Sequence, residues 1–175
     1  MGNYIEGKLV KIMEKITRKV ESPGKKVVQK LVYLIQRKGV NLGFDYAIHY
    51  YGPYSSELDD FLYSLKIKGI LDIVPDGNKH RIDFIGDEYG EYEEEELKIS
   101  AVEETLIEEV LEYFGNKSGR ELELITTVDF VKRKLGKNKC LANRDVIEAV
   151  QKIKSDKFSA DEIERAIYVL EKHIN

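Results

Sequence analysis

The residues that could carry out nucleophilic or metal-dependent chemistry are few and far apart. The chain of 175 residues contains three histidines, His49, His80 and His173, and one cysteine, Cys140. None of them has the short spacing to another that metal ligands show, so we expect no metal ion. Lysines near Cys140 would favour its thiolate, but no nucleophile motif surrounds it. We therefore interpret Cys140 as a small apolar residue.

Neither the glycines nor the acidic residues form a catalytic pattern. The 13 glycines fall at expected turns and helix ends instead of in a phosphate-binding loop. The glutamates at 93–96 lack the apolar surroundings that would raise the pKa of one carboxyl and leave its neighbour ionised. We therefore predict that the protein is not an enzyme and that it uses no cofactor. An enzyme is the least favoured alternative, and a deep pocket lined by His49, tyrosines and a carboxylate would favour it.

The distribution of charge favours a binding function. Residues 1–50 contain ten lysines and arginines against four carboxylates, whereas residues 87–128 contain three against fourteen. Two expected helices in the basic region carry a stripe at helical spacing, formed by Lys8, Lys11, Lys15 and Arg18 on one and by Lys26, Lys30, Tyr33 and Arg37 on the other. The stripes predict a surface for an anionic partner, which could be nucleic acid, an acidic protein or the chain's own Glu-rich segment. The alternative is a solvated polar face without a partner.

A second candidate binding element is a tyrosine-rich motif with the residues His49, Tyr50, Tyr51, Gly52, Pro53, Tyr54 and Ser55. Aromatic and β-branched residues predict a strand over 45–51, and Gly52-Pro53 predicts a sharp turn that ends it. The simplest interpretation is a stiff corner between a strand and a helix that Ser55 or Ser56 caps. The sharper interpretation is a surface patch, because tyrosine is common among the anchor residues of protein interfaces.

The elements that would position these residues follow from apolar periodicity and capping signals. Helical spacing predicts three helices in the first half of the chain, over about 3–20, 23–38 and 56–68. Ser22-Pro23 has the residue types of an N-cap and a first helical position. Two β-type runs at 70–74 and 80–85 flank Asp76-Gly77 and predict a hairpin, which would be the wing of a winged helix.

The second half of the chain is predicted to be helical after an acidic stretch. The capping-box pattern, a serine followed three residues later by a glutamate, occurs at Ser100, Ser118 and Ser159, and Asn143 is expected to cap a shorter helix. The predicted fold is mainly α with a small β-hairpin or a three-stranded sheet. We expect a winged-helix-like lobe at 1–86, an acidic linker at 87–97 and a helical lobe at 98–175, and the two lobes could share one core.

The third expected helix argues against simple DNA binding. It precedes the wing, where a winged-helix protein has its recognition helix, but its polar positions include Glu57, Asp59 and Asp60. Carboxylates repel phosphates, and proteins that read the grooves of DNA use mainly Arg, Lys, Asn and Gln. A DNA-binding transcriptional regulator therefore remains the alternative function.

The sequence also indicates where the protein works. No apolar run approaches the ~20 residues that span a bilayer, and the N-terminal residues lack the pattern of a secretory signal. A single cysteine fits a reducing compartment. We expect a cytoplasmic protein without a membrane partner, and the apolar stripes of the C-terminal helices could support a homodimer.

Three segments of the first half resemble a known group of proteins. Residues 26–34, 39–42 and 49–58 combine a QKL-YL helix, a short strand, a YGP turn and a helix that opens with S-EL. This combination resembles the YwgA-like group of uncharacterised prokaryotic proteins and, more distantly, the Panacea domain of antitoxins and phage-associated proteins. The resemblance covers about 25–74. It implies a non-enzymatic regulatory protein that acts through protein–protein contacts, for example by holding a toxin inactive, and it brings no catalytic residues.

Overall fold

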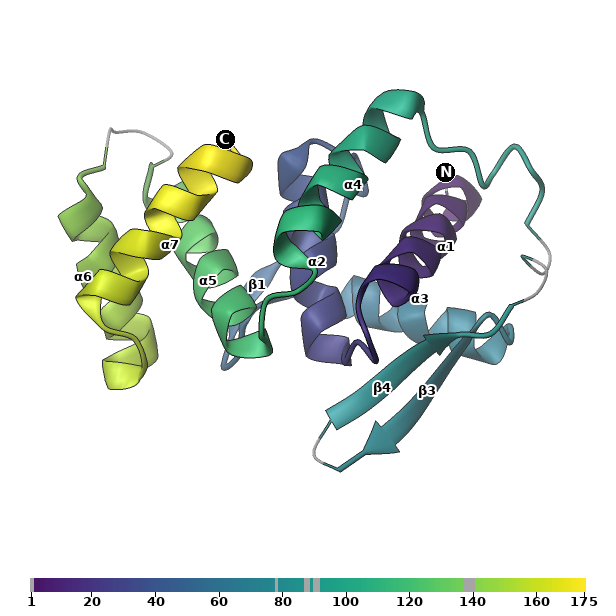
Figure 1. Ribbon diagram of the computed structural model, residues 1–175, viewed down its shortest axis with the longest axis horizontal. Helices are drawn as coiled ribbons and strands as arrows, with labels where there is room; N and C mark the ends of the chain where they lie inside the picture. Colours follow the sequence, from purple (N-terminus) through teal and green to yellow (C-terminus); the bar gives the residue numbers. More distant parts are fainter. Residues whose placement is uncertain (1, 78, 87–88, 90–91, 137–140) are drawn as a thin grey trace.

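The computed structural model describes residues 2–77, 79–86, 89, 92–136 and 141–175. The prediction of a mainly α fold with a small β-hairpin is confirmed (Figure 1). The elements of these residues are α1 (Gly2–Lys19), α2 (Lys25–Lys38), β1 (Ala47–His49), β2 (Gly52–Tyr54), α3 (Ser56–Ile67), β3 (Leu71–Asp76), β4 (Lys79–Phe84), α4 (Ala101–Phe114), α5 (Gly119–Leu135), α6 (Asn143–Lys154), the 3-10 helix η2 (Ser155–Lys157) and α7 (Ala160–His173). None of the helices among them is long and apolar enough to cross a lipid bilayer.

Helix α2 lies in the middle of the molecule and packs against α4, α5 and β2 (Figure 1). All of its residues from Val28 to Ile35 are buried, so this stretch has no face in solvent. Helix α5 is buried over most of its length and packs against α6 and α7. Buried apolar side chains from all seven α-helices form one connected cluster. The core continues across the predicted boundaries between the lobes, and these boundaries stay a prediction.

Short-range capping signals are largely confirmed. At Ser100, Ser118 and Ser159 the serine Oγ accepts a hydrogen bond from the backbone N–H three residues later, and the glutamate there accepts one from the serine N–H. Ser55 caps α3 without a capping box: its Oγ accepts a hydrogen bond from the N–H of Leu58, and its own N–H donates to Gln29. Asn143 is not a cap. It is the first residue of α6 and follows Ala142, which has no capping side chain.

The tyrosine-rich motif forms a hairpin, which differs from the predicted single strand. β1 pairs with β2 in antiparallel register, with Tyr50 and Tyr51 in the turn between them. Gly52 has a φ of 89°, which its missing Cβ permits, and it begins β2 instead of ending a strand. Pro53 lies opposite Ile48, a position where its missing N–H breaks no ladder hydrogen bond.

The predicted start of α2 at Ser22-Pro23 is wrong. Ser22 has a φ of 49°, Gly24 is the N-cap, and the helix begins at Lys25. The residues before it pair instead with the edge of β4, where the N–H of Ile82 donates to the carbonyl of Pro23 over 2.9 Å. This pairing gives the Ile82 N–H a hydrogen-bond acceptor, and it determines where the helix begins more strongly than the local capping signal does.

The predicted second hairpin is confirmed, with Leu71 opposite Phe84 and Asp76 opposite Lys79. Ile73 and Ile82 face each other and are buried against the core, while the tip of the hairpin is exposed. In the part of the chain that the structure describes, β3–β4 and β1–β2 form separate two-stranded sheets, so the three-stranded alternative is wrong there.

Parts of the acidic stretch before α4 are docked on α1. The hydroxyl of Tyr92 donates to Glu6 over 2.6 Å, and that of Tyr89 donates to Glu14 over 3.0 Å. Gly7 allows the backbone at Glu96 to approach closely, since a Cβ there would lie 2.1 Å from the Glu96 oxygen. The glutamates at 93–95 are exposed, as predicted. The connection between the two halves is therefore anchored at described residues along its length.

Candidate binding cleft beside the tyrosine hairpin

The basic stripe of α1 is paired within the chain. Lys8 is buried and forms an ion pair with Glu103, and Lys15 contacts Glu104 over 2.7 Å. The remaining two residues, Lys11 and Arg18, both form ion pairs with Glu14 of the same helix. Of the partners left open by the sequence, the chain's own Glu-rich region is the one that contacts this stripe. The prediction of a free anionic-partner surface is wrong for Lys8 in particular, because α4 covers it.

The basic stripe of α2 is mostly not a surface. Lys30 is 3% exposed and Tyr33 is 2% exposed. The hydroxyl of Tyr33 donates to Asp129 of α5 over 2.6 Å, and Arg37 donates to the same carboxylate over 2.7 Å. Only Lys26, in the first turn of α2, is exposed. The prediction is wrong for Lys30, Tyr33 and Arg37 because α5 and β2 pack on the helix face that they share.

The tyrosine-rich motif is divided between the surface and the interior. Tyr50 is 79% and Tyr51 is 44% exposed, and their rings pack edge to face with centroids 4.8 Å apart. His49 is exposed beside the half-buried Tyr54. The remaining residues of the motif, Gly52, Pro53 and Ser55, are buried. The corner and patch interpretations thus apply to different residues of one hairpin.

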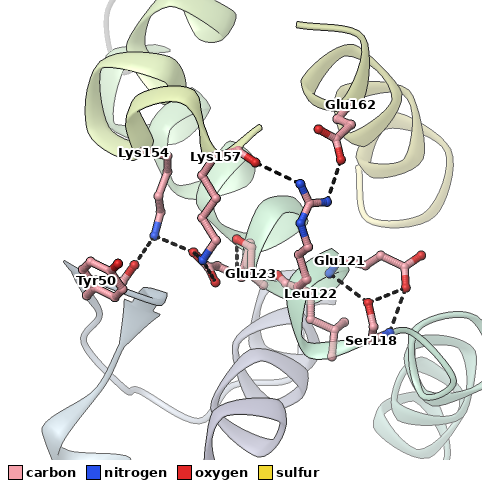
Figure 2. A network of polar contacts seen from close by, with 10 residues as sticks. Tyr50, Ser118, Glu121, Leu122, Glu123, Lys154, Lys157 and Glu162 are labelled. Atoms are coloured by element: carbon pink, nitrogen blue, oxygen red, sulfur yellow. Dashed lines mark hydrogen bonds and ion pairs between the residues drawn. The ribbon is translucent and has the colours of Figure 1, made fainter. Parts of the chain in front are cut away.

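Lysines from three elements support the hairpin, and Figure 2 shows those of α6 and η2. The Nζ of Lys154 donates to the carbonyl of Tyr50 and, over 2.9 Å, to Glu123 of α5. Lys157 of η2 donates to both carboxylate oxygens of Glu123. Lys30 of α2 donates to the carbonyl of Pro53 over 2.5 Å. We call Lys30, Glu123, Lys154 and Lys157 the hairpin network.

Burial acts on the ionisation of this network in opposite directions. Burial disfavours the charge of Glu123, but hydrogen bonds from Lys157 and Lys154 outweigh burial and lower the pKa of its carboxyl. Burial lowers the pKa of Lys30 to about 8, and the positive charges of Lys154 and Lys26 add to this effect against the opposing charge of Glu123. The Glu123 carboxylate therefore pairs with Lys154 and Lys157, and it acts on Lys30 only through its charge.

The hairpin forms one wall of a cleft with a volume of about 870 Å³. The opposite walls come from the segment between α1 and α2, from the tip of β4 and from the turn between α4 and α5. The cleft gathers most of the predicted motif residues and adds His80, which the sequence left as an isolated histidine. Its charged lining residues are five lysines and three carboxylates, Lys25, Lys26, Lys30, Lys79, Lys117, Glu21, Asp59 and Glu121.

Sequence reasoning missed the residues that support and complete this site. Glu123, Lys154 and Lys157 were not singled out. A signal existed for Glu123, because it interrupts the apolar residues Leu122, Leu124 and Ile125 on a helix. The turn at 115–119, which lines the cleft, carried no signal beyond its cap.

The other candidates for chemistry lie elsewhere. His173 stacks on Tyr113 with ring centroids 3.4 Å apart, and burial together with the nearby Lys172 lowers its pKa. Cys140 lies outside the described residues. Among those that are described, no three His, Cys, Asp or Glu side chains come together as metal ligands.

No protein-family model matches the chain, and a search of curated proteins finds no significant match. The resemblance to YwgA-like and Panacea proteins therefore stays a prediction.

Proposed function

We propose that the protein is a non-enzymatic regulatory protein that acts through protein–protein contacts, with Tyr50 and Tyr51 as anchors for the partner. The observation that carries this proposal is the exposure of two tyrosine rings on the turn of a hairpin whose backbone carbonyls accept hydrogen bonds from buried lysines. Lys154 binds the carbonyl of Tyr50, and Lys30 binds that of Pro53. Figure 2 shows Lys154 reaching Tyr50 from α6.

The physical case for anchors rests on their cost of binding. A tyrosine contributes a large amphipathic contact area and loses few rotamers, and a rigid backbone lowers the entropy cost of association further. Exposed tyrosines on a mobile loop would lack this advantage. The adjoining cleft gives a partner a concave surface beside the anchors, which is where hot-spot residues are usually found.

The DNA-binding alternative has less support. Most of the basic groups on α1 and α2 that would contact phosphates are paired within the chain, and α3 presents exposed Glu57 and Asp60. Phosphate contacts make affinity fall steeply with salt, so a titration with duplex DNA separates the two functions. We expect no salt-dependent complex with the wild-type protein.

Affinity capture from cells of the source organism tests the proposal, with nuclease treatment to remove bridging nucleic acid. We expect a stoichiometric protein partner with the wild type and its loss with the double variant Tyr50→Ala/Tyr51→Ala. The matched control is Tyr63→Ala/Tyr168→Ala, which removes two exposed tyrosines of α3 and α7 that do not line the cleft. A partner retained by Tyr50→Ala/Tyr51→Ala, or no partner with the wild type, would overturn the proposal.

An antitoxin-like role is the specific form of this function that the resemblance implies. Its test is co-expression of the chain with each neighbouring gene that inhibits growth by itself. Restored growth with the wild type and with the Tyr63→Ala/Tyr168→Ala control, but not with Tyr50→Ala/Tyr51→Ala, is the expected result. Restoration by all three proteins would show that the hairpin is not the contact surface.

A further inference from the structure

We propose that the cleft beside the tyrosine hairpin binds an acidic peptide segment of the partner protein, and that Lys26, Lys79 and Lys117 receive its carboxylates. The inference rests on the proposed function, because it names the chemistry of the partner that would reach Tyr50 and Tyr51. It adds a class of ligand and a set of lysines outside the hairpin itself.

The charge of the cleft has the opposite sign to the net charge of the chain. The chain as a whole has a net charge of −4, yet the cleft is lined by five lysines, of which Lys30 is buried, and by three carboxylates. An excess of positive charge collected in a concave surface attracts acidic ligands more strongly than the same charge on a convex one. The cleft is thus a positive region on a negative molecule.

The lining carboxylates form no ion pair with these three lysines, although hydrogen bonds from Ser118 and, to a smaller extent, the charge of Lys117 lower the pKa of Glu121. Asp59 forms an ion pair with Lys25 over 2.9 Å. Glu121 accepts hydrogen bonds from the backbone N–H and the hydroxyl of Ser118, at 2.8 and 2.7 Å, as Figure 2 shows. Within the described residues, Lys26, Lys79 and Lys117 have no carboxylate within ion-pair distance.

The position of Lys26 links the charge to the anchors. Its Nζ lies 3.2 Å from the centroid of the Tyr51 ring, a cation–π contact that holds the ammonium at the wall of the cleft. A partner side chain that contacts Tyr51 would therefore lie close to this ammonium. Val20, Pro23 and Val27 also line the cleft and provide apolar contact for the peptide residues between the acidic ones.

The mixed sign of the lining favours a peptide over nucleic acid. A nucleic acid brings a phosphate at every nucleotide, and Glu21, Asp59 and Glu121 would repel those that pass them. A peptide can place its carboxylates opposite lysines and uncharged residues opposite glutamates. The N-terminus of α5 is also unavailable to a phosphate, because the Glu121 carboxylate already accepts a hydrogen bond in the capping box there.

A displayed library of random peptides, each about twelve residues long, tests the inference with the full-length wild-type protein. We expect the selected peptides to be enriched in Asp and Glu, and the best of them to bind at least about tenfold more weakly to Lys26→Glu/Lys117→Glu in fluorescence anisotropy. The control is Lys152→Glu, which reverses an exposed charge on α6 outside the cleft. Circular dichroism confirms that each variant is folded.

The results separate this inference from the proposed function. It is overturned if no peptide is selected, if the selected peptides have no acidic bias, if both variants bind equally, or if duplex DNA of equal length displaces the peptide. In the capture experiment, the partner could be lost with Tyr50→Ala/Tyr51→Ala but retained by Lys26→Glu/Lys117→Glu. That result would refute the binding role of the cleft lysines and would still support the proposed function. If acidic peptides bind to the cleft but no partner protein is captured, the proposed function is refuted and peptide binding by the cleft lysines is supported.

Discussion

Two groups of lysine–glutamate pairs in this protein have the same chemistry and opposite surroundings. One group joins α1 and α2 to α4, through Lys15 with Glu104 and Glu108, Lys19 with Glu112, and Lys38 with Glu109. Its carboxylates are at least half exposed, up to 77% for Glu112. We call it the exposed ladder. The other group is the hairpin network, in which the side chain of Glu123 is 6% exposed.

The difference shows that burial, more than the number of ion pairs, decides what such pairs contribute. Exposed pairs exchange strong hydration for weak attraction and are screened by salt, so they add little to stability. A buried carboxylate cannot lose its partners without leaving charges unsolvated. The exposed ladder adds short-range attraction to helices that already pack through apolar side chains, while the hairpin network determines where Tyr50 and Pro53 lie.

The largest effect is expected for Glu123→Ala. Removal of this carboxylate leaves Lys154 buried without a counter-charge and Lys157 without its partner, and breaking a buried pair costs about 3–5 kcal/mol. Urea unfolding followed by circular dichroism measures the loss in free energy of unfolding. The matched control is Glu171→Ala, whose pair with Lys132 is half exposed and whose loss should be small. Equal effects of the two variants would show that burial does not separate the groups.

A pH titration of stability isolates Lys30 within the hairpin network. Its pKa is about 8 in the folded protein against 10.5 when unperturbed. Between these values the unfolded chain binds more protons than the folded protein, so stability rises with pH through this range. Relative to Lys30→Met, the wild type should gain about 2–3 kcal/mol in free energy of unfolding between about pH 8 and pH 10.5. A difference between the two proteins that is constant with pH would contradict a depressed pKa.

An intermediate effect is expected for Asp129→Asn, which tests a second buried carboxylate on α5. Asp129 accepts hydrogen bonds from Tyr33 and Arg37, and Arg37 is partly exposed, so water can solvate part of the lost charge. We expect a loss of about 2 kcal/mol, the size of a hydrogen bond to a charged group. The control is Asp83→Asn, which breaks an exposed pair with Arg81. An effect as small as that of the control would place Asp129 with the exposed ladder.

The sequence predicted the features that depend on nearby residues. The three capping boxes, the Ser55 cap and the Asp76-Gly77 hairpin were confirmed because each is formed within a few residues of backbone. The burial of Tyr33 and Arg37 could not be predicted in this way. Their acceptor lies 96 and 92 residues further along the chain, and their spacing on α2 is the same as that of an exposed basic stripe.

The candidate site was predicted in part for the same reason. The tyrosine-rich motif identified one wall of the cleft, since tyrosine and Gly52-Pro53 mark a corner locally. The walls from the β4 tip and the α4–α5 turn come together only when α2 is packed between the two halves of the chain (Figure 1). A basic stripe does not show whether its counter-charges come from a partner or from the same chain. Here Lys8, Lys15 and Arg37 pair with α4 and α5, while Lys11 and Arg18 pair with Glu14 of α1 itself.

The smallest effect is expected for Lys15→Ala, which breaks two contacts of the exposed ladder at once. Its carboxylate partners remain solvated after the change, so Tm should fall by no more than about 2–4 °C at low salt. At about 1 M NaCl, where the Debye length falls to about 3 Å, the difference from the wild type should become smaller. Thermal unfolding at both salt concentrations measures it, with Glu123→Ala as the comparison. Because Glu123 and its counter-charge Lys154 are buried and poorly screened, the deficit of Glu123→Ala should persist at high salt. A deficit that salt removed equally from both variants would mean that the two groups of pairs do not differ.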